Sequence, residues 1–481
     1  MTRTGLNGLT PEQQRNGDLV DKAVDGQSVW IGCGAGFSGD RPDAPGPVVQ
    51  ALIDSGRPAY LIFEMLAERT LALAQLRRRH HAEGGYFQGL EQVLGPILAQ
   101  CQAHRIPIIG NFGAADPLGA ARRIEAIAKA AGCPSLRIAA VTGDDMLSAL
   151  QADELLAMPR HPPTEIPPGS LVSANVYLGA EGIAAALRQG ADVVVTGRVA
   201  DPALALGALV HHFGWRADDW DRLAAGVLAG HLLECGAQVT GGYFADPGFK
   251  DVPNLAQVGY PIAEVMASGE LVITKPRGTG GCVTVQTVKE QMLYEIHDPS
   301  AYLTPDVTLD ISAVQVSEVA PDRVKVIGAR GQPRPQTLKA TVCFDGGHMG
   351  EGEISYAGPN ARARGLLAID ILRQRLALCE LPVSSHFDLI GVTSVLNGYG
   401  EDMLLANANE QAPDVRVRMA VSAADRETVA RALNEVDALY TCGPSGGGGV
   451  RTSIVPLMQS TSVFADRDAF QPTVTMLEPN L

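Results

Sequence analysis

Short β-branched runs alternate with longer amphipathic stretches along the first half of the chain, and this pattern restricts the possible folds more than any other feature. Buried strands that alternate with helices form a parallel sheet with right-handed crossover connections. The pattern predicts an α/β fold with a doubly wound, mostly parallel, Rossmann-like sheet, and an eight-stranded α/β barrel is the competing topology. The predicted strands are residues 28–33, 59–63, 106–111, 136–141, 170–176 and 191–197.

The sequence changes in texture after about residue 270, where longer alternating runs favour antiparallel pairing. Helical patterns at 361–378 and 425–440 add to an α+β lobe. The alternating runs are 271–296, 307–319, 323–330 and 338–347, with further strands near 387–396 and 415–422. We expect a ligand crevice between two domains. The predicted parts are an N-terminal extension (1–27), an α/β domain (28–265) and an α+β domain (266–481).

The charge of the chain argues against two classes of partner. It has 38 Lys and Arg against 53 Asp and Glu, a net charge of −15 that repels phosphate backbones and anionic bilayers. The N-terminal residues lack the apolar core of an export signal, and no later stretch has the length and apolarity of a membrane helix. The cysteines form no C-x-x-C pair, so neither a zinc knuckle nor a disulfide framework is indicated. We expect a cytoplasmic protein that binds neither nucleic acid nor membrane.

Polar residues directly follow several predicted strands. Glu64 and Asn111 end the second and third strands, and Thr196, Gly197 and Arg198 end or follow the sixth. Loops at the carboxyl ends of parallel strands emerge at one edge of the sheet, where ligands of α/β proteins bind. We therefore expect these residues to meet at one site.

One local pattern occurs twice. In residues 108–117 and 194–202, a strand leads through a short loop into Ala-Asp-Pro and then an alanine-rich helix. An Asp before Pro fits a helix N-cap, because its carboxylate accepts hydrogen bonds from unpaired N–H groups and Pro has no N–H. Asp116 and Asp201 are therefore predicted caps, and proton transfer by Asp201 is the functional alternative.

A glycine-rich loop follows the first predicted strand. Gly34, Gly36 and Gly39 match the G-x-G-x-x-G pattern of dinucleotide-binding loops. The next residues, DRPDAPGP, oppose the helix whose N-terminus would bind a pyrophosphate. We expect the loop, with Gly34, Gly36 and Ser38, to admit another ligand or to form a tight turn. An NAD-linked oxidoreductase is the third functional alternative.

Carboxylates and a histidine occur in pairs at helical spacing. Glu64 and Glu68 are four residues apart, and His231 and Glu234 are three apart. Either pair could bind a cation or move protons. The sequence has no second carboxylate–histidine unit at matching spacing, and such pairs also stabilise helices without further function. No metal site is therefore predicted.

Cations lie among glycines near the predicted domain junction. Lys275, Arg277 and Gly280 belong to the string KPRGTGG, where backbone N–H groups can approach an anion closely. A hairpin with unrelated charges is the alternative.

Four successive glycines follow Ser445 in the segment 440–449. Ordering glycines is unfavourable, so this segment predicts an anion-binding nest or a mobile lid that includes Ser445, Gly446 and Gly447. Cys442 has no neighbouring base in the sequence, and a plain thiol is expected there.

Several strings resemble the acyclic terpene utilisation protein A family. They include GAGFSGDR (34–41), FE-x-LAERT (63–70), TGRVADP (196–202) and CGAQ-x-TGGYFADP (235–247). The resemblance covers most of residues 28–450 and implies a role beside enzymes that degrade citronellol and geraniol through coenzyme A thioesters. It also implies that a small ferredoxin-like chain can act as a partner, because some members carry such a domain. It assigns no catalytic residues.

Together, the residues and the resemblance predict a cytoplasmic, homo-oligomeric catabolic enzyme, a lyase or hydratase acting on a branched or carboxylated acyl-CoA. Coenzyme A is part of the substrate, and no tightly bound cofactor is expected. Glu64 or Asp201 would move a proton, Arg198 and Arg277 would hold an anionic group, and Lys275 would stabilise enolate charge. A non-catalytic binding or scaffold subunit of an acyl-CoA-handling complex is the alternative.

Overall fold

The structure, a computed structural model, describes residues 28–81, 84–159, 170–397 and 412–477, so the predicted extension 1–27 lies outside it. The described chain divides into two compact units. The first unit holds most residues up to 341 together with 462–477, and the second holds 170–172, 342–397 and 412–461. The chain passes between the units within β5 (Leu171–Val176), β14 (Thr337–Ala357) and β17 (Gly448–Asp466).

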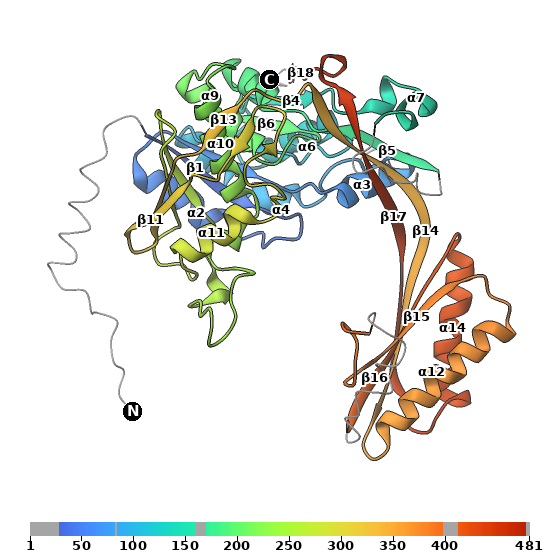
Figure 1. The fold of residues 1–481 in the computed structure, drawn as a ribbon. Coiled ribbons are helices and arrows are strands. Elements are labelled where there is room, and N and C mark those ends of the chain that lie inside the picture. Colours follow the sequence, from blue (N-terminus) through green and yellow to red (C-terminus); the bar gives the residue numbers. More distant parts are fainter. Residues whose placement is uncertain (1–27, 82–83, 160–169, 398–411, 478–481) are drawn as a thin grey trace, which may run out of the picture. The chain divides into compact units, whose positions relative to one another are not determined.

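A ten-stranded mixed sheet forms the centre of the first unit (Figure 1). Its parallel part has the order β1 (Ser28–Ala35), β2 (Ala59–Phe63), β3 (Ile108–Gly110), β6 (Val193–Thr196) and β4 (Ile138–Thr142). These strands are short and almost wholly buried, as expected for strands covered on both faces. Antiparallel strands extend the sheet at both ends. They are β7 (Ile262–Met266), β8 (Leu271–Thr274), β12 (Arg323–Ile327) and β11 (Gln315–Ala320) beside β1, and β18 (Thr473–Met476) beside β4.

Helices pack against the parallel strands. Leu61 and Phe63 of β2 share one face of the sheet, because alternate residues of a strand point the same way, and they contribute to a hydrophobic core with helices. The helices of that core are α2 (Pro45–Ser55), α4 (Leu90–Leu94), α5 (Leu98–Ala103) and α6 (Pro117–Ala130). A second set also contacts the sheet: α8 (Glu181–Arg188), α9 (Ala203–Phe213) and α10 (Trp220–Glu234). The predicted α/β class is confirmed.

Two expected strands have different positions or structures. Residues 170–176 form β5, which pairs with β14 instead of joining the parallel sheet, because β18 occupies the free side of β4. Residues 271–296 begin as β8 but continue into the helix α11 (Val285–Leu293), where the Thr284 side chain accepts the Thr287 N–H. The described sheet is open, with β11 and β18 at its edges, so it does not close into the competing barrel.

The large sheet combines strands from both sides of residue 265. Strands β8, β11 and β12 lie in the same sheet as β1 to β4, and the two compact units divide at residues 341 and 342. Three further strands form a small sheet in the first unit. They are β13 (Arg330–Gln332), β10 (Thr308–Asp310) and β9 (Tyr302–Leu303).

The second unit has a βαββαβ order among its described elements. They are β14, α12 (Ala361–Leu378), β15 (Ser384–Ile390), β16 (Asp414–Ala423), α14 (Arg426–Cys442) and β17, and the sheet order is β15-β16-β14-β17. Strand β16 lies between β14 and β15 and is antiparallel to both, so β14 and β15 are parallel to each other. Strands β14 and β15, joined by α12, therefore form a split βαβ unit, as in ferredoxin-like folds. Gly350 and Gly352 allow α14 to approach β14, because a Cβ atom there would lie within 3 Å of Val429 or Val436.

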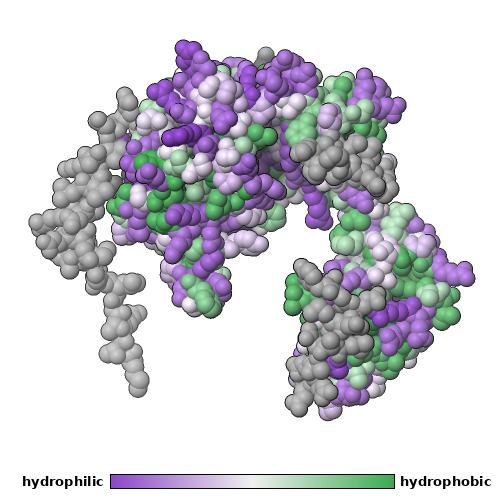
Figure 2. Space-filling view, viewed as in Figure 1, coloured by the Kyte–Doolittle hydropathy of each residue, from purple (hydrophilic) through white to green (hydrophobic). Residues whose placement is uncertain are grey.

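Exposed apolar side chains of the first unit are interspersed among hydrophilic ones on the face shown in Figure 2. Among the described residues of this unit, Tyr243 and Phe249 are the most exposed large apolar ones. None of the described helices is long and apolar enough to cross a bilayer.

Candidate functional site

A cavity of about 750 Å³ lies in the first unit, at the carboxyl ends of the parallel strands. Its walls include Gly36 and Asp40 after β1, Glu64 after β2, and Arg198 and Asp201 after β6. Parallel strands bring these loops to the same edge. The structure therefore brings together Glu64, Arg198 and Asp201, three of the residues for which proton transfer or anion binding was predicted.

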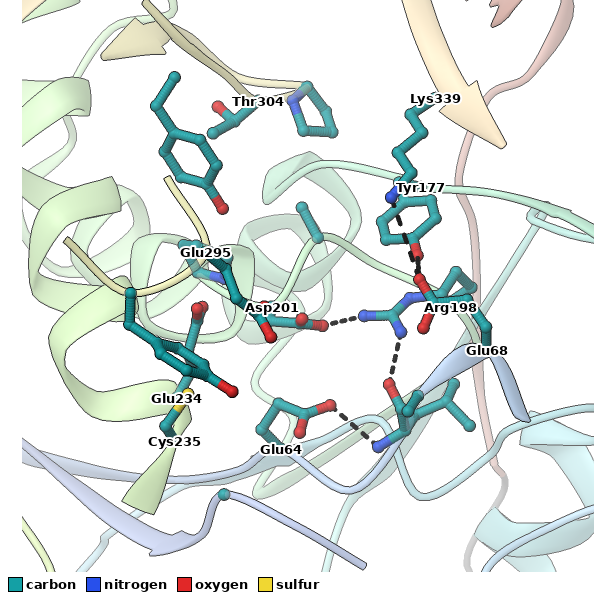
Figure 3. A pocket seen from close by; sticks show the side chains of 18 of the residues that line it. Glu64, Glu68, Tyr177, Arg198, Asp201, Glu234, Cys235, Glu295, Thr304 and Lys339 are labelled. Atoms are coloured by element: carbon teal, nitrogen blue, oxygen red, sulfur yellow. Dashed lines mark hydrogen bonds and ion pairs between the residues drawn. The ribbon is translucent and has the colours of Figure 1, made fainter. Parts of the chain in front are cut away.

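Carboxyl groups dominate the charge of the cavity. Figure 3 shows several of them around one hollow, contributed by separate segments of the chain. The lining carboxyl residues are Asp40, Glu64, Glu68, Asp201, Glu234 and Glu295, and the lining cations are Arg198 and Lys339. These negative charges disfavour the binding of an anionic ligand unless some of the carboxyl groups are protonated.

Glu64 is held by two hydrogen bonds. Its Oε1 accepts the Leu66 N–H (2.9 Å) and the Asn111 side-chain N–H (2.8 Å), and the Asn111 Oδ1 accepts the Met65 N–H (2.7 Å). Burial raises the pKa of Glu64 to about 7, although Arg198 and the two hydrogen bonds oppose this rise. A carboxyl group with this pKa can give or take a proton at neutral pH.

Arg198 is almost completely buried, and its donors point at protein acceptors. Nε and Nη2 donate to the Val199 carbonyl (2.8 and 2.6 Å), Nη1 donates to the Leu66 carbonyl, and Nη2 also donates to Asp201. The guanidinium also lies 4.5 Å from the centre of the Tyr177 ring. Arg198 therefore ties the loop after β2 to the loop after β6.

The two Ala-Asp-Pro loops differ in what their aspartates do. Asp116 Oδ1 accepts the Gly119 N–H (2.9 Å) and caps α6, as predicted. Asp201 makes no cap hydrogen bond, because its carboxylate pairs with Arg198. The cap prediction is confirmed for Asp116 and wrong for Asp201, whose side chain is 36% exposed and lines the cavity.

Glu68 follows Glu64 by four residues and begins α3 (Glu68–His80), whereas Glu64 precedes the helix, so the two carboxylates do not share a helix face. The electrostatic environment of Glu68 is also opposite to that of Glu64. The Tyr177 hydroxyl donates to its Oε1 (2.5 Å), and the Lys339 Nζ lies 3.9 Å from the same oxygen. Burial alone would raise the pKa of Glu68, but the Tyr177 hydrogen bond and the nearby Arg198 and Lys339 charges lower it overall. Glu68 is therefore the permanent anion and Glu64 the titrating group.

Glu234 reaches the cavity from the last residue of α10. Its Oε1 lies 2.9 Å from the His231 Nδ1, so the predicted i, i+3 pair forms.

The end of β1 lies close to the backbone at the end of α10. A Cβ atom on Gly36 would lie 2.1 Å from the Gly236 N and 2.3 Å from the Glu234 O. Glycine at position 36 therefore lets the end of β1 pack directly against the end of α10, which accounts for one glycine of the G-x-G-x-x-G string.

Other predicted site residues do not line the cavity. Lys275 is buried, donates to the Thr279 carbonyl (3.0 Å) and pairs with Asp322 (3.3 Å). Thr196 is buried and donates to the Gly197 carbonyl (3.0 Å). The remaining residues outside the lining are Gly34, Ser38, Asn111, Gly197, Arg277 and Gly280 in the first unit, and Ser445, Gly446 and Gly447 in the second.

The glycine loop of the second unit connects α14 to β17. Gly446 and Gly449 have φ values of 72° and 69°, a conformation that favours glycine. Arg364 Nη1 donates to the Ser445 carbonyl (2.7 Å). Backbone conformation therefore accounts for two of these glycines.

Several lining residues had no signal in the sequence. Tyr302, Lys339 and Phe464 come from distant segments with no motif in common. Glu234 belongs to a pair that the sequence indicates, and Tyr177 directly follows the predicted strand 170–176, but the sequence does not show which side chains lie beside them. In the part of the chain that the structure describes, no group of three or more His, Cys, Asp or Glu is arranged to hold a metal ion.

The fold and the cavity define an α/β protein with a cavity lined by carboxyl groups at the carboxyl edge of its parallel strands. The sequence model of the acyclic terpene utilisation family protein AtuA matches residues 29–476, and the chain therefore belongs to this family. Family membership links the chain to the utilisation of acyclic terpenes. No curated protein and no solved structure matches it.

Proposed function

We propose that this chain is a cytoplasmic enzyme of acyclic terpene utilisation, a lyase or hydratase that removes water from, or adds water to, a branched acyl thioester of coenzyme A. The observation that carries this proposal is the environment of Glu64. Asn111 and the Leu66 N–H fix its carboxyl group at the cavity, and burial brings its pKa to about 7. Such a group suits the proton transfers of hydration and elimination.

The lining supports a branched acyl group over a carboxylated one. Six lining carboxyl groups against two cations disfavour a further carboxylate. Apolar side chains such as Leu66, Leu303, Leu338 and Phe464 supply contact area for a hydrocarbon chain. The volume of about 750 Å³ suits a small-molecule ligand. The phosphates of coenzyme A would remain outside this acidic cavity.

Two further expectations belong to this proposal. Helix contacts such as those of α6 and α8 with β4 and β6 support a doubly wound, Rossmann-like sheet. Assembly into a homo-oligomer is one further proposal, and a small ferredoxin-like partner chain is proposed from the resemblance.

The test is turnover of branched 2-enoyl and 3-hydroxyacyl thioesters by the purified chain, followed by the absorbance of the enoyl thioester. Glu64→Gln should lower kcat by about 10²–10⁴, because it removes the titrating group. Glu91→Gln is the matched control, since Glu91 pairs with Arg123 outside the cavity. Binding that raises Tm without turnover by the unaltered chain would favour the non-catalytic binding subunit.

A further inference from the structure

We propose that Glu234, positioned by His231, is a second proton-transfer residue of the cavity and acts as a pair with Glu64 on a substrate bound between them. This inference rests on the proposed function. It adds the acid that hydration requires in addition to a base.

One carboxylate oxygen of Glu234 is buried without a partner among the described residues. The residue is only 7% exposed, yet it lines the cavity. Its Oε1 lies 2.9 Å from the His231 Nδ1, while its Oε2 is buried with no hydrogen-bond partner among the described residues. A buried polar atom without a partner costs about 1–3 kcal/mol. In this proposal, a substrate or water bound in the cavity becomes that partner.

His231 holds the orientation of Glu234. It is 1% exposed, and its backbone carbonyl accepts a hydrogen bond from the Gln291 Nε2 (2.9 Å). Its ring lies 5.6 Å from the ring of Tyr302, which lines the cavity. With Nδ1 engaged by Glu234, the imidazole can hold that carboxyl in one orientation. His231 is not itself among the lining residues and is therefore a positioning residue.

The charges around the two carboxyl groups favour opposite protonation states. Burial raises the pKa of both groups, and the charge of Glu234 further raises the pKa of Glu64. The nearby Arg198 charge acts in the opposite direction on both. One group is therefore protonated most easily when the other is ionised. The other charged or titratable neighbours of Glu234 are His231, Glu295, Cys235 and Tyr302.

The pair completes a balanced hydration. Ionised Glu64 takes a proton from water, and the water oxygen forms a C–O bond at the β-carbon of the enoyl thioester. The electrons of the C=C bond move to the α-carbon, which then takes the proton of Glu234. One water molecule is added, and the net transfer of a proton from Glu234 to Glu64 is reversed through solvent. Elimination follows the same steps backwards.

The first test compares Glu234→Gln with Glu64→Gln in the full chain. Each should lower kcat by about 10² or more while KM changes less than about threefold, and the double variant should be little worse than either single variant. Glu234→Gln should also remove the alkaline limb of the pH–rate profile, because that limb reports loss of the acid. Denaturant unfolding of each variant shows whether it is folded. The Glu91→Gln control shows the effect of the same substitution outside the cavity.

A second variant separates positioning from structure. His231→Leu removes a group that lowers the pKa of Glu234, so the alkaline limb should move to higher pH. An unchanged pH profile would contradict the positioning role.

The third test needs no turnover. In protein with ¹³C-labelled Glu carboxyl groups, Glu234→Gln should move the Glu64 titration midpoint downward, because a neighbouring negative charge is removed. Full kcat and an intact profile in Glu234→Gln, with activity lost in Glu64→Gln, would overturn this inference and leave the proposed function standing. A shifted midpoint in a protein that turns over none of the thioesters would contradict the proposed function but support the pairing.

Discussion

The loops after β3 and β6 share the Ala-Asp-Pro pattern but use it differently. In the first loop Asp116 caps α6, and in the second Asp201 pairs with Arg198 and lines the cavity. Three residues before Asp116 the chain has Gly113, where a Cβ atom would lie 2.6 Å from the Thr196 carbonyl. At the equivalent position before Asp201 the chain has Arg198, which pairs with that aspartate, whereas Gly113 has no side chain to pair with Asp116.

Both loops still contribute to the site. The first contributes Asn111, whose side chain holds Glu64 and also accepts the Met65 N–H. The second contributes Arg198, which donates to the Leu66 carbonyl. The same segment after β2 is thus fixed by an amide on one side and a guanidinium on the other. The comparison teaches that a shared local pattern does not imply shared chemistry.

Replacing the guanidinium is expected to have the largest effect. Arg198→Met leaves the partly exposed Asp201 and two buried backbone carbonyls without their donor, and each buried acceptor left unpaired costs about 1–3 kcal/mol of unfolding free energy. Chemical denaturation measures the loss. Arg123→Met is the control, because that arginine forms an exposed pair with Glu91 and should cost no more than about 1 kcal/mol. Equal losses would contradict the distinction between the two loops.

The next largest expected effect is the change in unfolding free energy with pH. The pKa of Glu64 is raised to about 7 in the folded chain, so the folded state binds more protons than the unfolded state between about pH 4.5 and 7. The stabilising contribution of Glu64 is present below its unfolded pKa and is lost as the pH rises through about 7. A difference of one unit between the folded and unfolded pKa values corresponds to about 1.4 kcal/mol of unfolding free energy. The partial exposure of Glu64 to solvent reduces this value.

Glu64→Gln is the variant that isolates this contribution, since Gln cannot ionise. Relative to the unaltered chain, it should become more stable as the pH rises from 5 to 8. Denaturation at a series of pH values measures the difference. A constant difference would mean that the pKa of Glu64 is not raised.

Removing each aspartate should give the smallest changes in stability and separate the loops most clearly. Asp116→Ala removes a helix cap and should cost about 1 kcal/mol of stability without changing turnover. Asp201→Ala should lower turnover at least about tenfold, equivalent to about 1.4 kcal/mol in the barrier, with a smaller loss of stability than Arg198→Met. Thermal unfolding and kcat are the measurements, and equal losses of turnover would contradict the comparison.

Local pattern was enough to predict most elements of the parallel sheet. The runs at 28–33, 59–63, 106–111, 136–141 and 191–197 all lie in it, and the helices at 361–378 and 425–440 match α12 and α14 closely. Residues 170–176 were correctly expected to be a strand, but their partner is β14. Strand type depends on the residues themselves, whereas strand pairing depends on which edges other segments leave free.

Local pattern also predicted part of the candidate site. Glu64 and Arg198 could be placed at one edge because parallel strands end together, and both line the cavity. Lys275 was not predictable in this way, because Asp322, a distant residue in sequence, pairs with it away from the cavity.

The sequence by itself determined the α/β alternation, the acidic charge, the family and the placement of polar residues at strand ends, because each depends on local composition or on matching strings. Only the tertiary structure decided which carboxyl groups share a cavity and which of them titrate near neutrality. Glu64, Glu68 and Glu234 have the same side chain. Burial and the donors brought to each by distant segments set their pKa values apart, and no local stretch of sequence records those distances.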